Sequence, residues 1–320
     1  MDSEKQISRW DFLRSRRSRI ILAICGVIAV LAIVIPSATV LTLREKHNMG
    51  PKSKVFVPLY VYPAAGAGHR WRMSMSSRSS VLRNPPPMEH ARSVSISTHP
   101  NVSFTVVVNP SSGPGPNALP DSNYTQAIQE LNRYDNVRLL GYVATTYTKR
   151  NISLARQDIE TYSEWPTKSS NPDLAVQGIF FDETPQKYEP NSLAYLQSLT
   201  ATVMKMPGLG PDRFIVHNPG VVPDSRYLSS ANSTVVFEGT YDSFMERHGA
   251  KLFKLPSSNR GQLCALIHSI PDSITGSDLR GLVKQARKVA EGIFITHLST
   301  DYYAEFGAKW QEFVRLMAAG

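Results

Sequence analysis

The sequence has little cysteine and lacks several common catalytic motifs. Its 320 residues include only two cysteines, Cys25 and Cys264, which excludes a small domain framed by disulfides and a zinc site built from cysteines. There is no G-x-S-x-G elbow, no H-E-x-x-H helix and no G-x-x-x-x-G-K-[ST] phosphate-binding loop. An α/β-hydrolase, a zincin and a P-loop nucleotide hydrolase are therefore not indicated.

The larger part of the chain also lacks an excess of positive charge, although the net charge is +9. Residues 1–100 contain 15 Lys and Arg against 5 Asp and Glu, whereas residues 101–320 contain 20 against 21. A nucleic-acid enzyme carries its basic surface on the folded body, so we expect no nucleic-acid partner. With 42% hydrophobic and 19% charged residues, the chain has the composition of a globular protein.

One long uncharged run is present, near the N-terminus. The 24 residues from 20 to 43 include no Asp, Glu, Lys or Arg, and as a helix rising about 1.5 Å per residue they are long enough to cross a bilayer. A cleaved signal peptide is the alternative, but its apolar region is usually about 7–15 residues long. We predict a retained transmembrane signal anchor at residues 20–43, after a basic cytoplasmic tail (1–19) and before a polar stalk (44–53).

The residues on either side of this run indicate its orientation. Six Lys and Arg precede the run and four follow it closely, which favours a cytoplasmic N-terminus. Four N-glycosylation sequons beyond the run support a lumenal or extracellular body: Asn101, Asn123, Asn151 and Asn232. We therefore predict a single-pass type II membrane protein whose body is a monomer at the cell surface.

The body contains eight apolar runs of strand length, at residues 54–62, 103–109, 137–145, 176–182, 213–218, 234–238, 263–268 and 292–297. The runs are continuous rather than alternating, as in strands buried on both faces. Segments with helical periodicity lie between or after them, at residues 121–134, 153–165, 191–206, 278–290 and 304–317. Strands that alternate with helices indicate a parallel sheet, and eight repeats over residues 54–320 match a (β/α)₈ TIM-type barrel. An open doubly wound sheet is the alternative.

One segment does not fit this pattern. Residues 72–92 are rich in Ser and Arg, include three consecutive prolines and show no usable periodicity. They occupy the place of the first helix. We predict a disordered insertion here, with a gene-model artefact as the alternative.

In a barrel of this type the active site lies at the carboxyl ends of the strands, so the residues that end the runs are the candidates. Asp182 and Glu183 follow the apolar residues IFF, and Glu238 follows VVF. A carboxylate in such surroundings is costly to bury without a role. The candidates for substrate binding are Tyr62, Asn109, Tyr147, His217, Asn218, His268 and Asp301.

Two of the carboxylates are placed to act as a pair. Alternation sends Asp182 and Glu183 to opposite sides of the strand, so one of them faces the mouth. The fourth and sixth strands contribute inward side chains to the same layers, which can bring Glu238 to a facing position. Glycosidic cleavage needs one carboxyl to protonate the leaving oxygen and another to attack carbon or activate water. The alternative is that these acids pair with arginines or cap the next helices.

Three histidines also lie at strand ends: His217, His268 and His297. Their spacing is not diagnostic of a metal site, and we interpret them as partners of sugar hydroxyls or as structural hydrogen-bonding groups. We expect no metal and no cofactor.

An ordered set of short motifs resembles the spherulin-4 family of fungal cell-surface and slime-mould spherulation proteins. The motifs are VPLYVYP (57–63), VNP (108–110) with SGPG (112–115), GYV (141–143), GIFFDE (178–183), HNPG (217–220) and FE (237–238). The resemblance covers the body from about residue 55 to the end. The segment 72–92 departs from the family pattern and puts the first βα segment in doubt.

This resemblance implies a (β/α)₈ glycoside hydrolase similar to endo-α-1,4-N-acetylgalactosaminidases, which cut galactosamine-containing exopolysaccharide. The family's acidic triad falls on Asp182, Glu183 and Glu238, and implies that Asp182 and Glu238 carry catalysis. We assign Asp182 as the nucleophile and Glu238 as the acid/base. We therefore predict a membrane-anchored glycosidase acting on cell-wall or extracellular polysaccharide. The alternative is a non-catalytic barrel that binds polysaccharide.

Overall fold

The computed structural model describes residues 52–60, 62–63, 95–249, 253 and 259–319. The predicted tail (1–19), anchor (20–43), most of the stalk (44–51) and the insertion (72–92) lie outside these residues. Within the described part of the chain, no helix combines the length and the hydropathy that a membrane span requires.

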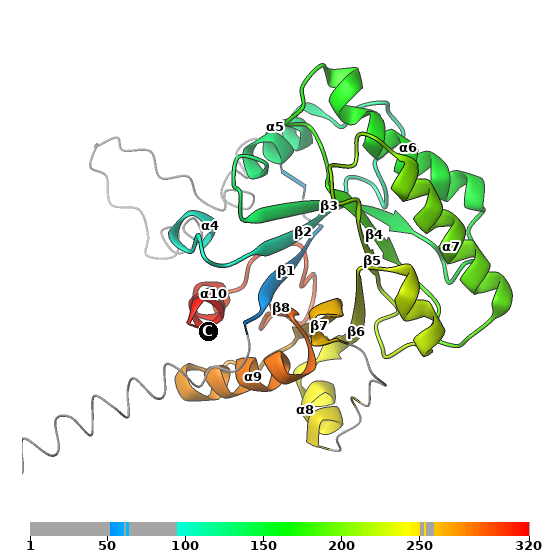
Figure 1. Cartoon of the computed structure of the whole chain (residues 1–320). Coiled ribbons are helices and arrows are strands. Elements are labelled where there is room, and N and C mark those ends of the chain that lie inside the picture. The colour runs from blue at the N-terminus through cyan, green and yellow to red at the C-terminus, as the bar shows by residue number, and fades with distance from the viewer. Residues whose placement is uncertain (1–51, 61, 64–94, 250–252, 254–258, 320) are drawn as a thin grey trace, which may run out of the picture. The chain divides into compact units, whose positions relative to one another are not determined.

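Eight parallel strands form a closed barrel in which each strand pairs with its neighbours in sequence and β8 pairs with β1, as Figure 1 shows. The strands are β1 (Lys54–Leu59), β2 (Phe104–Val108), β3 (Val137–Ala144), β4 (Gly178–Asp182), β5 (Phe214–His217), β6 (Ser233–Thr240), β7 (Leu263–His268) and β8 (Gly292–Ile295). Most of their residues are buried, because helices cover the outside of the barrel and side chains fill its interior. The predicted (β/α)₈ fold is confirmed.

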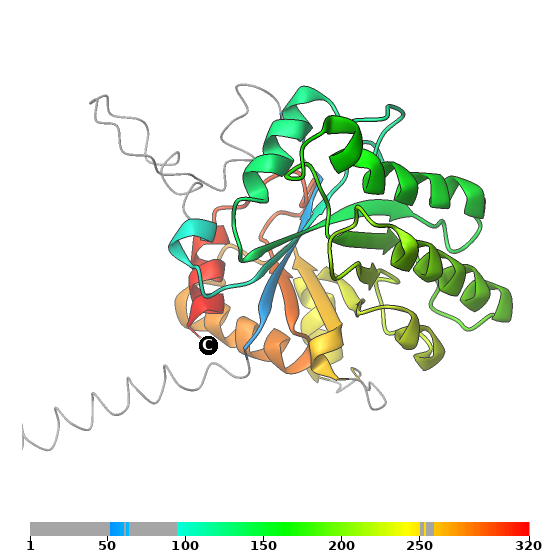
Figure 2. The same cartoon turned by 45° about the horizontal axis from the view of Figure 1, so that its top comes forward.

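The helices surround the barrel in both cartoon views (Figures 1 and 2). The described α-helices are α4 (Ser95–Thr98), α5 (Ser122–Leu131), α6 (Ile152–Ser169), α7 (Pro190–Lys205), α8 (Tyr241–Gly249), α9 (Gly276–Val289) and α10 (Trp310–Ala318). Two 3₁₀ helices are also present, η1 (Ser225–Ser230) and η2 (Arg260–Gln262). Two of the described α-helices begin at a side-chain cap. Asp121 accepts hydrogen bonds from two amides at the start of α5, and Asn151 accepts one at the start of α6, which satisfies donors that the helix leaves free.

The last helix differs from the sequence-based expectation. It begins at Trp310 rather than at residue 304. Gly307 lies so close to the end of β8 that a Cβ atom there would be 2.3 Å from His297 Nδ1. The chain therefore turns tightly against the barrel over residues 301–307 before the helix can start.

Helix α9 also differs, because one of its cations is buried. The apolar stripe through Leu279 and Val283 predicts that Lys and Arg lie on the opposite face of this helix, but Arg287 is fully buried. Its guanidinium donates hydrogen bonds to the carbonyl oxygens of Leu316 and Met317, at 3.1 and 2.8 Å. These carbonyls belong to the last turn of α10, where a cation is favourable. Arg287 thus joins the two helices.

Side chains alternate between the inside and the outside of the barrel along each strand. On β4, Phe180 faces inward, where its ring centroid lies 5.8 Å from that of Phe56 and 6.1 Å from that of Tyr142. Two residues further along, Asp182 takes the same inward direction at the carboxyl end of the strand. Alternation therefore places Asp182 at the mouth.

A β-bulge in β6 sets the direction of Glu238. Val235 pairs with Cys264 and Phe237 pairs with Ala265, so Val236 is an extra residue without a partner. One extra residue sends the side chains that follow to the other face. Phe237 consequently packs outside the barrel, with its ring 5.3 Å from that of Phe244 in α8. Glu238, the next residue, turns into the mouth.

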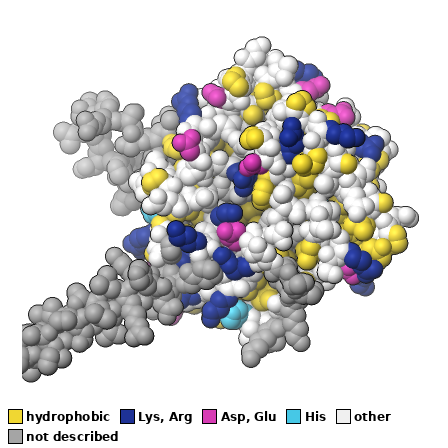
Figure 3. All heavy atoms as spheres, in the orientation of Figure 1, with side chains coloured by type: hydrophobic (Ala, Val, Ile, Leu, Met, Phe, Trp, Pro, Cys, Tyr) yellow, Lys and Arg dark blue, Asp and Glu magenta, His cyan; other side chains and the backbone are white. Residues whose placement is uncertain are grey.

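On the face shown in Figure 3, Lys and Arg side chains are interspersed with Asp and Glu side chains. This mixture agrees with the near-neutral charge balance of residues 101–320.

Candidate active site

The site is centred on Asn218, which connects two of the predicted acids. Its Nδ2 atom donates hydrogen bonds to Asp182 Oδ1 at 2.8 Å and to Glu238 Oε2 at 2.7 Å. Asp182 ends β4, Asn218 directly follows β5, and Glu238 lies on β6. Three successive strands of the barrel therefore bring these side chains to one point at its carboxyl end.

The orientation of the Asn218 amide follows from its second contact. Its Oδ1 atom accepts a hydrogen bond from the backbone amide of Gly220 at 2.9 Å. Because an amide N–H can only donate, the oxygen must face Gly220 and the nitrogen must face the carboxylates. The Gly220 carbonyl in turn accepts from the Glu238 amide at 2.9 Å, so the loop after β5 is fixed to β6.

Each carboxylate also receives a hydrogen bond from a tyrosine. Tyr142 Oη on β3 donates to Asp182 Oδ2 at 2.8 Å, and Tyr303 Oη, after β8, donates to Glu238 Oε1 at 2.7 Å. Tyr60, at the end of β1, lies between these tyrosines, with ring centroids 5.5 Å from Tyr142 and 5.4 Å from Tyr303. The rings form a continuous aromatic wall beside the acids.

The electrostatics of the site follow from burial and from the proximity of the two acids. Burial raises the pKa of Asp182 above its ordinary value of 3.8, and the charge of Glu238 adds to the rise, while the hydrogen bonds from Tyr142 and Asn218 lower it. Burial, followed by the neighbouring carboxylates, raises the pKa of Tyr60, Tyr142 and Tyr303 far above 10. All three tyrosines therefore stay neutral, and Tyr142 and Tyr303 act as hydrogen-bond donors.

The third predicted acid, Glu183, lies just beyond the end of β4 and has a left-handed backbone with φ of 53°. Its carbonyl oxygen accepts hydrogen bonds from Thr145 Oγ1 at 2.8 Å and from the Tyr147 amide at 2.6 Å. Its carboxylate makes no hydrogen bond to any other residue that the structure describes. The Glu183 carboxylate thus lies beside the pair without a hydrogen bond to it.

Three of the predicted binding residues lie around β1, β2 and β3. Tyr62 is 48% exposed, accepts a hydrogen bond from Asn123 and contacts the ring of Tyr124. Asn109 accepts from the Gly113 amide at 3.0 Å, which shapes the loop after β2. Tyr147 is 55% exposed.

The remaining predicted binding residues have different surroundings. His268, at the end of β7, stacks on Tyr302 with ring centroids 4.1 Å apart, and burial lowers its pKa. His217 is buried against Phe181 on the outer side of the sheet, and burial lowers its pKa to about 3. Asp301 is exposed in the loop after β8. Of the seven binding candidates, only Asn218 contacts the two acids directly.

Sequence reasoning did not find the tyrosines that hold the acids. Tyr142 belongs to the GYV motif. Side chains two residues apart on a strand share a face, so an inward-facing Leu140 places Tyr142 inward as well, toward Asp182. This alternation could have identified Tyr142. Tyr303 lies in an irregular loop, where no periodicity predicts the direction of a side chain.

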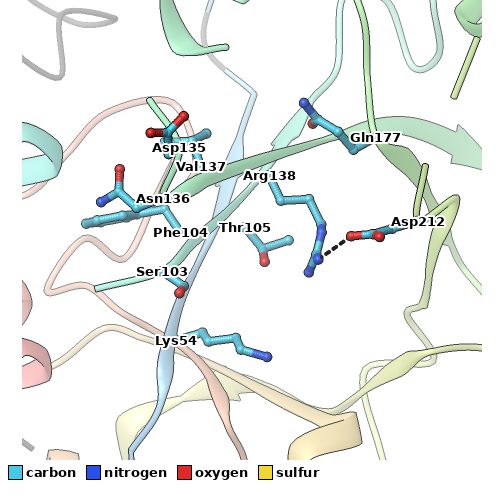
Figure 4. A pocket seen from close by; sticks show the side chains of 10 residues that line it. All are labelled: Lys54, Ser103, Phe104, Thr105, Asp135, Asn136, Val137, Arg138, Gln177 and Asp212. Carbon is cyan, nitrogen blue, oxygen red and sulfur yellow. Dashed lines mark hydrogen bonds and ion pairs between the residues drawn. The ribbon is translucent and has the colours of Figure 1, made fainter. Parts of the chain in front are cut away.

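A cavity lies at the end of the barrel opposite the acids (Figure 4). It has a volume of about 280 Å³ and is lined by residues near the starts of β1, β2 and β3, including Lys54 and Arg138. Both cations are paired: Arg138 contacts Asp212 at 2.8 Å, and Lys54 contacts Glu291 at 3.2 Å. Two carboxylates line this cavity, those of Asp135 and Asp212, and Asp212 is held in the ion pair with Arg138. Among the residues that the structure describes, no cluster of three His, Cys, Asp or Glu side chains is arranged to hold a metal ion.

Comparisons with known proteins relate the barrel to one protein family. The model of the spherulation-specific family 4 matches residues 54–317. Spherulin-4 of Physarum polycephalum is 28% identical over 208 residues, which are 65% of this chain and 51% of that protein, so the chain spans about half the length of this curated relative. The crystal structure of Aspergillus clavatus Sph3 in complex with GalNAc matches with a TM-score of 0.75 and 64% identity, over 84% of this chain and 99% of that one. Because the family match includes every strand of the barrel and all three acids, this chain belongs to spherulation-specific family 4.

Proposed function

We propose that this protein is a glycoside hydrolase that cleaves polysaccharide containing N-acetylgalactosamine, with Asp182 and Glu238 as its two catalytic carboxyls. The observation that carries the proposal is the pair of hydrogen bonds from Asn218 Nδ2, which holds two carboxylates close together at the mouth. The sugar class is supported by the Aspergillus clavatus Sph3 structure, 64% identical to this chain, which contains GalNAc.

The distance between the acids supports a particular stereochemistry. Both oxygens lie within 2.8 Å of Asn218 Nδ2, so they are no more than about 5.5 Å apart. Retaining glycosidases hold their carboxyls about 5–5.5 Å apart, whereas inverting enzymes need about 6.5–9.5 Å to admit a water molecule. We therefore include retention in the proposal, in which one carboxylate attacks the anomeric carbon.

In the proposed mechanism Asp182 attacks the anomeric carbon while Glu238 protonates the leaving oxygen. Hydrogen bonds from Tyr142 and Asn218 favour the ionised form of Asp182 and fix its orientation. Glu238 then removes a proton from the water that hydrolyses the glycosyl-enzyme intermediate. The hydrogen bond from Tyr303 holds its carboxyl in place through both steps.

Membrane anchoring and location remain part of the proposal. We propose that residues 20–43 anchor the protein and that the barrel lies outside the cytoplasm. Among the sequon asparagines, Asn101, Asn151 and Asn232 are exposed, as attachment of a glycan requires. Peptide-N-glycosidase treatment of the native protein would reduce its apparent mass if they are modified, and an unchanged mass would count against this location.

A polysaccharide-binding protein without activity is the competing function, because rim tyrosines suit binding as well as catalysis. The discriminating experiment measures the release of reducing ends from a purified galactosamine-containing exopolysaccharide, with Asp182→Asn as the control. The proposal predicts release by the wild-type protein and none by the variant. Binding without release, equal in both proteins, would support the competing function.

A further inference from the structure

The turn that follows β3 has an unusual backbone. Thr146, Tyr147 and Thr148 have φ values of 48°, 52° and 66°, so three successive residues other than glycine are left-handed. Each such residue is strained, because its Cβ atom crowds the following carbonyl group. Such conformations persist only where the surroundings impose them, and they occur preferentially at ligand-binding and active sites.

One side of this turn is fixed to the acids. The Thr145 hydroxyl donates to the carbonyl oxygens of Asp182 and Glu183, at 2.9 and 2.8 Å. The Tyr147 amide donates to the Glu183 carbonyl at 2.6 Å. The strained turn and the Asp182–Glu183 dipeptide therefore form one rigid unit.

The other side of the turn is fixed to the surrounding helices. Arg150 donates to the Ala144 carbonyl at 3.1 Å and forms a 2.7 Å ion pair with Asp158 of α6. Thr148 Oγ1 lies 2.8 Å from Ser192 Oγ of α7. These contacts hold the backbone in the strained conformation and leave the Tyr147 side chain 55% exposed.

The turn presents an aromatic ring that packs against no other ring among the residues that the structure describes. Tyr147 is 55% exposed, and neither its ring nor its hydroxyl contacts another described residue through ring packing or a hydrogen bond. Tyr62, the other exposed rim tyrosine, contacts Asn123 and Tyr124. Glu183, on the same unit, has a carboxylate that lacks a hydrogen-bond partner among the described residues.

We propose that Tyr147 and Glu183 form a sugar-binding subsite beside the cleavage point, which binds a unit of the polymer adjacent to the one attacked by Asp182. The proposal rests on the proposed glycosidase function and specifies how the substrate extends. The ring of Tyr147 covers the apolar face of the sugar, and the Glu183 carboxylate accepts a hydrogen bond from a sugar hydroxyl or acetamido N–H. Glu183 is in this account a binding residue rather than a proton donor or a nucleophile.

Binding in a catalytically inactive background tests the subsite without depending on turnover. Isothermal titration of the full-length Asp182→Asn protein with a GalNAc hexamer and with GalNAc itself gives the reference dissociation constants. Adding Tyr147→Ala should weaken hexamer binding about tenfold, as expected for the loss of an aromatic contact, and should leave GalNAc binding within about twofold. In the same background, Tyr147→Phe keeps the ring and should bind the hexamer with the dissociation constant of the Asp182→Asn protein.

Leu154→Ala is the matched control, because Leu154 is 50% exposed on α6 and belongs to no site described above. It should change neither dissociation constant. In the active protein, Tyr147→Ala should raise KM for the polymer about tenfold with kcat within about twofold, since the subsite binds ground state and transition state alike.

Two results would overturn the subsite. Hexamer binding unchanged in Tyr147→Ala would show that the ring does not contact the polymer. Equal losses for GalNAc and the hexamer would show that Tyr147 contacts the attacked sugar instead. Failure of the wild-type protein to release reducing ends from the polymer would refute the glycosidase proposal itself, so the two failures are distinguishable.

Discussion

Asp182 and Glu238 accept hydrogen bonds from a single nitrogen atom, at 2.8 and 2.7 Å. Two carboxylates that share a donor are held close together despite their like charges, and the charge of Glu238 adds to the rise in the pKa of Asp182. The donor is Asn218, whose orientation is fixed by the Gly220 amide. Asn218 thus forms a hydrogen-bonded bridge between the two acids, and variants of the residues around it test what the bridge does.

Removing the bridge should impair turnover. Asn218→Ala deletes a hydrogen bond to each carboxylate, and a hydrogen bond to a charged group is worth about 1.5–3 kcal/mol. We expect kcat/KM on polymer to fall about tenfold to a thousandfold. Asn136→Ala, which removes an amide bonded to backbone carbonyls far from the acids, is the control and should alter stability rather than turnover. Near-normal activity of Asn218→Ala would contradict the role given to the bridge.

The two adjacent tyrosines after β8 should behave differently. Tyr303→Phe removes the hydroxyl that donates to Glu238 but keeps the ring contacts with Tyr60 and Phe294. Loss of one such donor should lower kcat on polymer about tenfold. Tyr302→Phe keeps the stacked ring beside His268 and should retain activity within about twofold. Equal effects of both variants would show that the Tyr303 hydroxyl is not important for Glu238.

Stability should depend on pH through Asp182. Burial raises the pKa of this carboxyl in the folded protein, so its ionised form opposes folding at neutral pH. The stability lost on ionisation returns when the pH falls below 3.8, the ordinary pKa of an Asp carboxyl. Asp182→Asn should therefore raise the melting temperature at pH 7, and the gain should disappear in acid. Asp121→Asn is the control, because asparagine caps a helix as well as aspartate. A gain that is the same at every pH would contradict this origin.

Arg287 should matter to stability although it is far from the acids. Arg287→Met keeps most of the apolar stem but leaves the Leu316 and Met317 carbonyls without the guanidinium. We expect unfolding free energy to fall by about 2–4 kcal/mol, the scale for losing hydrogen bonds from a buried charged donor. Lys288→Met, at the next and exposed position of α9, should change it by less than about 0.5 kcal/mol. Urea denaturation measures both variants.

Much of the fold was predictable from the sequence. The continuous apolar runs indicated all eight strands, because strands buried on both faces leave little room for polar residues. The strand-end rule then selected Asp182, Glu183 and Glu238, since carboxylates that directly follow apolar runs are costly without a function. The family motifs led to the same three acids, and the resemblance implied that Asp182 and Glu238 are the catalytic pair.

Other features depend on contacts that no local pattern encodes. The bulge at Val236 turns Glu238 inward. Val235 faces inward beside Cys264, so regular alternation from Val235 would have placed Glu238 on the outer face. Arg287 is buried because the end of α10 presents carbonyl oxygens to it, which the amphipathic pattern of α9 cannot show. The left-handed turn at Thr146–Thr148 contains no glycine, the residue that usually indicates such a backbone. Contacts with Thr145, Glu183 and Arg150 impose its conformation instead.

The most direct test of the two-carboxylate mechanism compares two variants on two substrates. Initial rates are measured for Glu238→Gln and Asp182→Asn on the polymer and on a GalNAc glycoside whose leaving group needs no proton. Glu238→Gln should cost at least about a hundredfold on polymer, as expected for loss of a general acid, and far less on the activated glycoside, whereas Asp182→Asn should abolish activity on both. Near-normal turnover of polymer by Glu238→Gln, or equal loss by both folded variants on both substrates, would contradict the assigned roles.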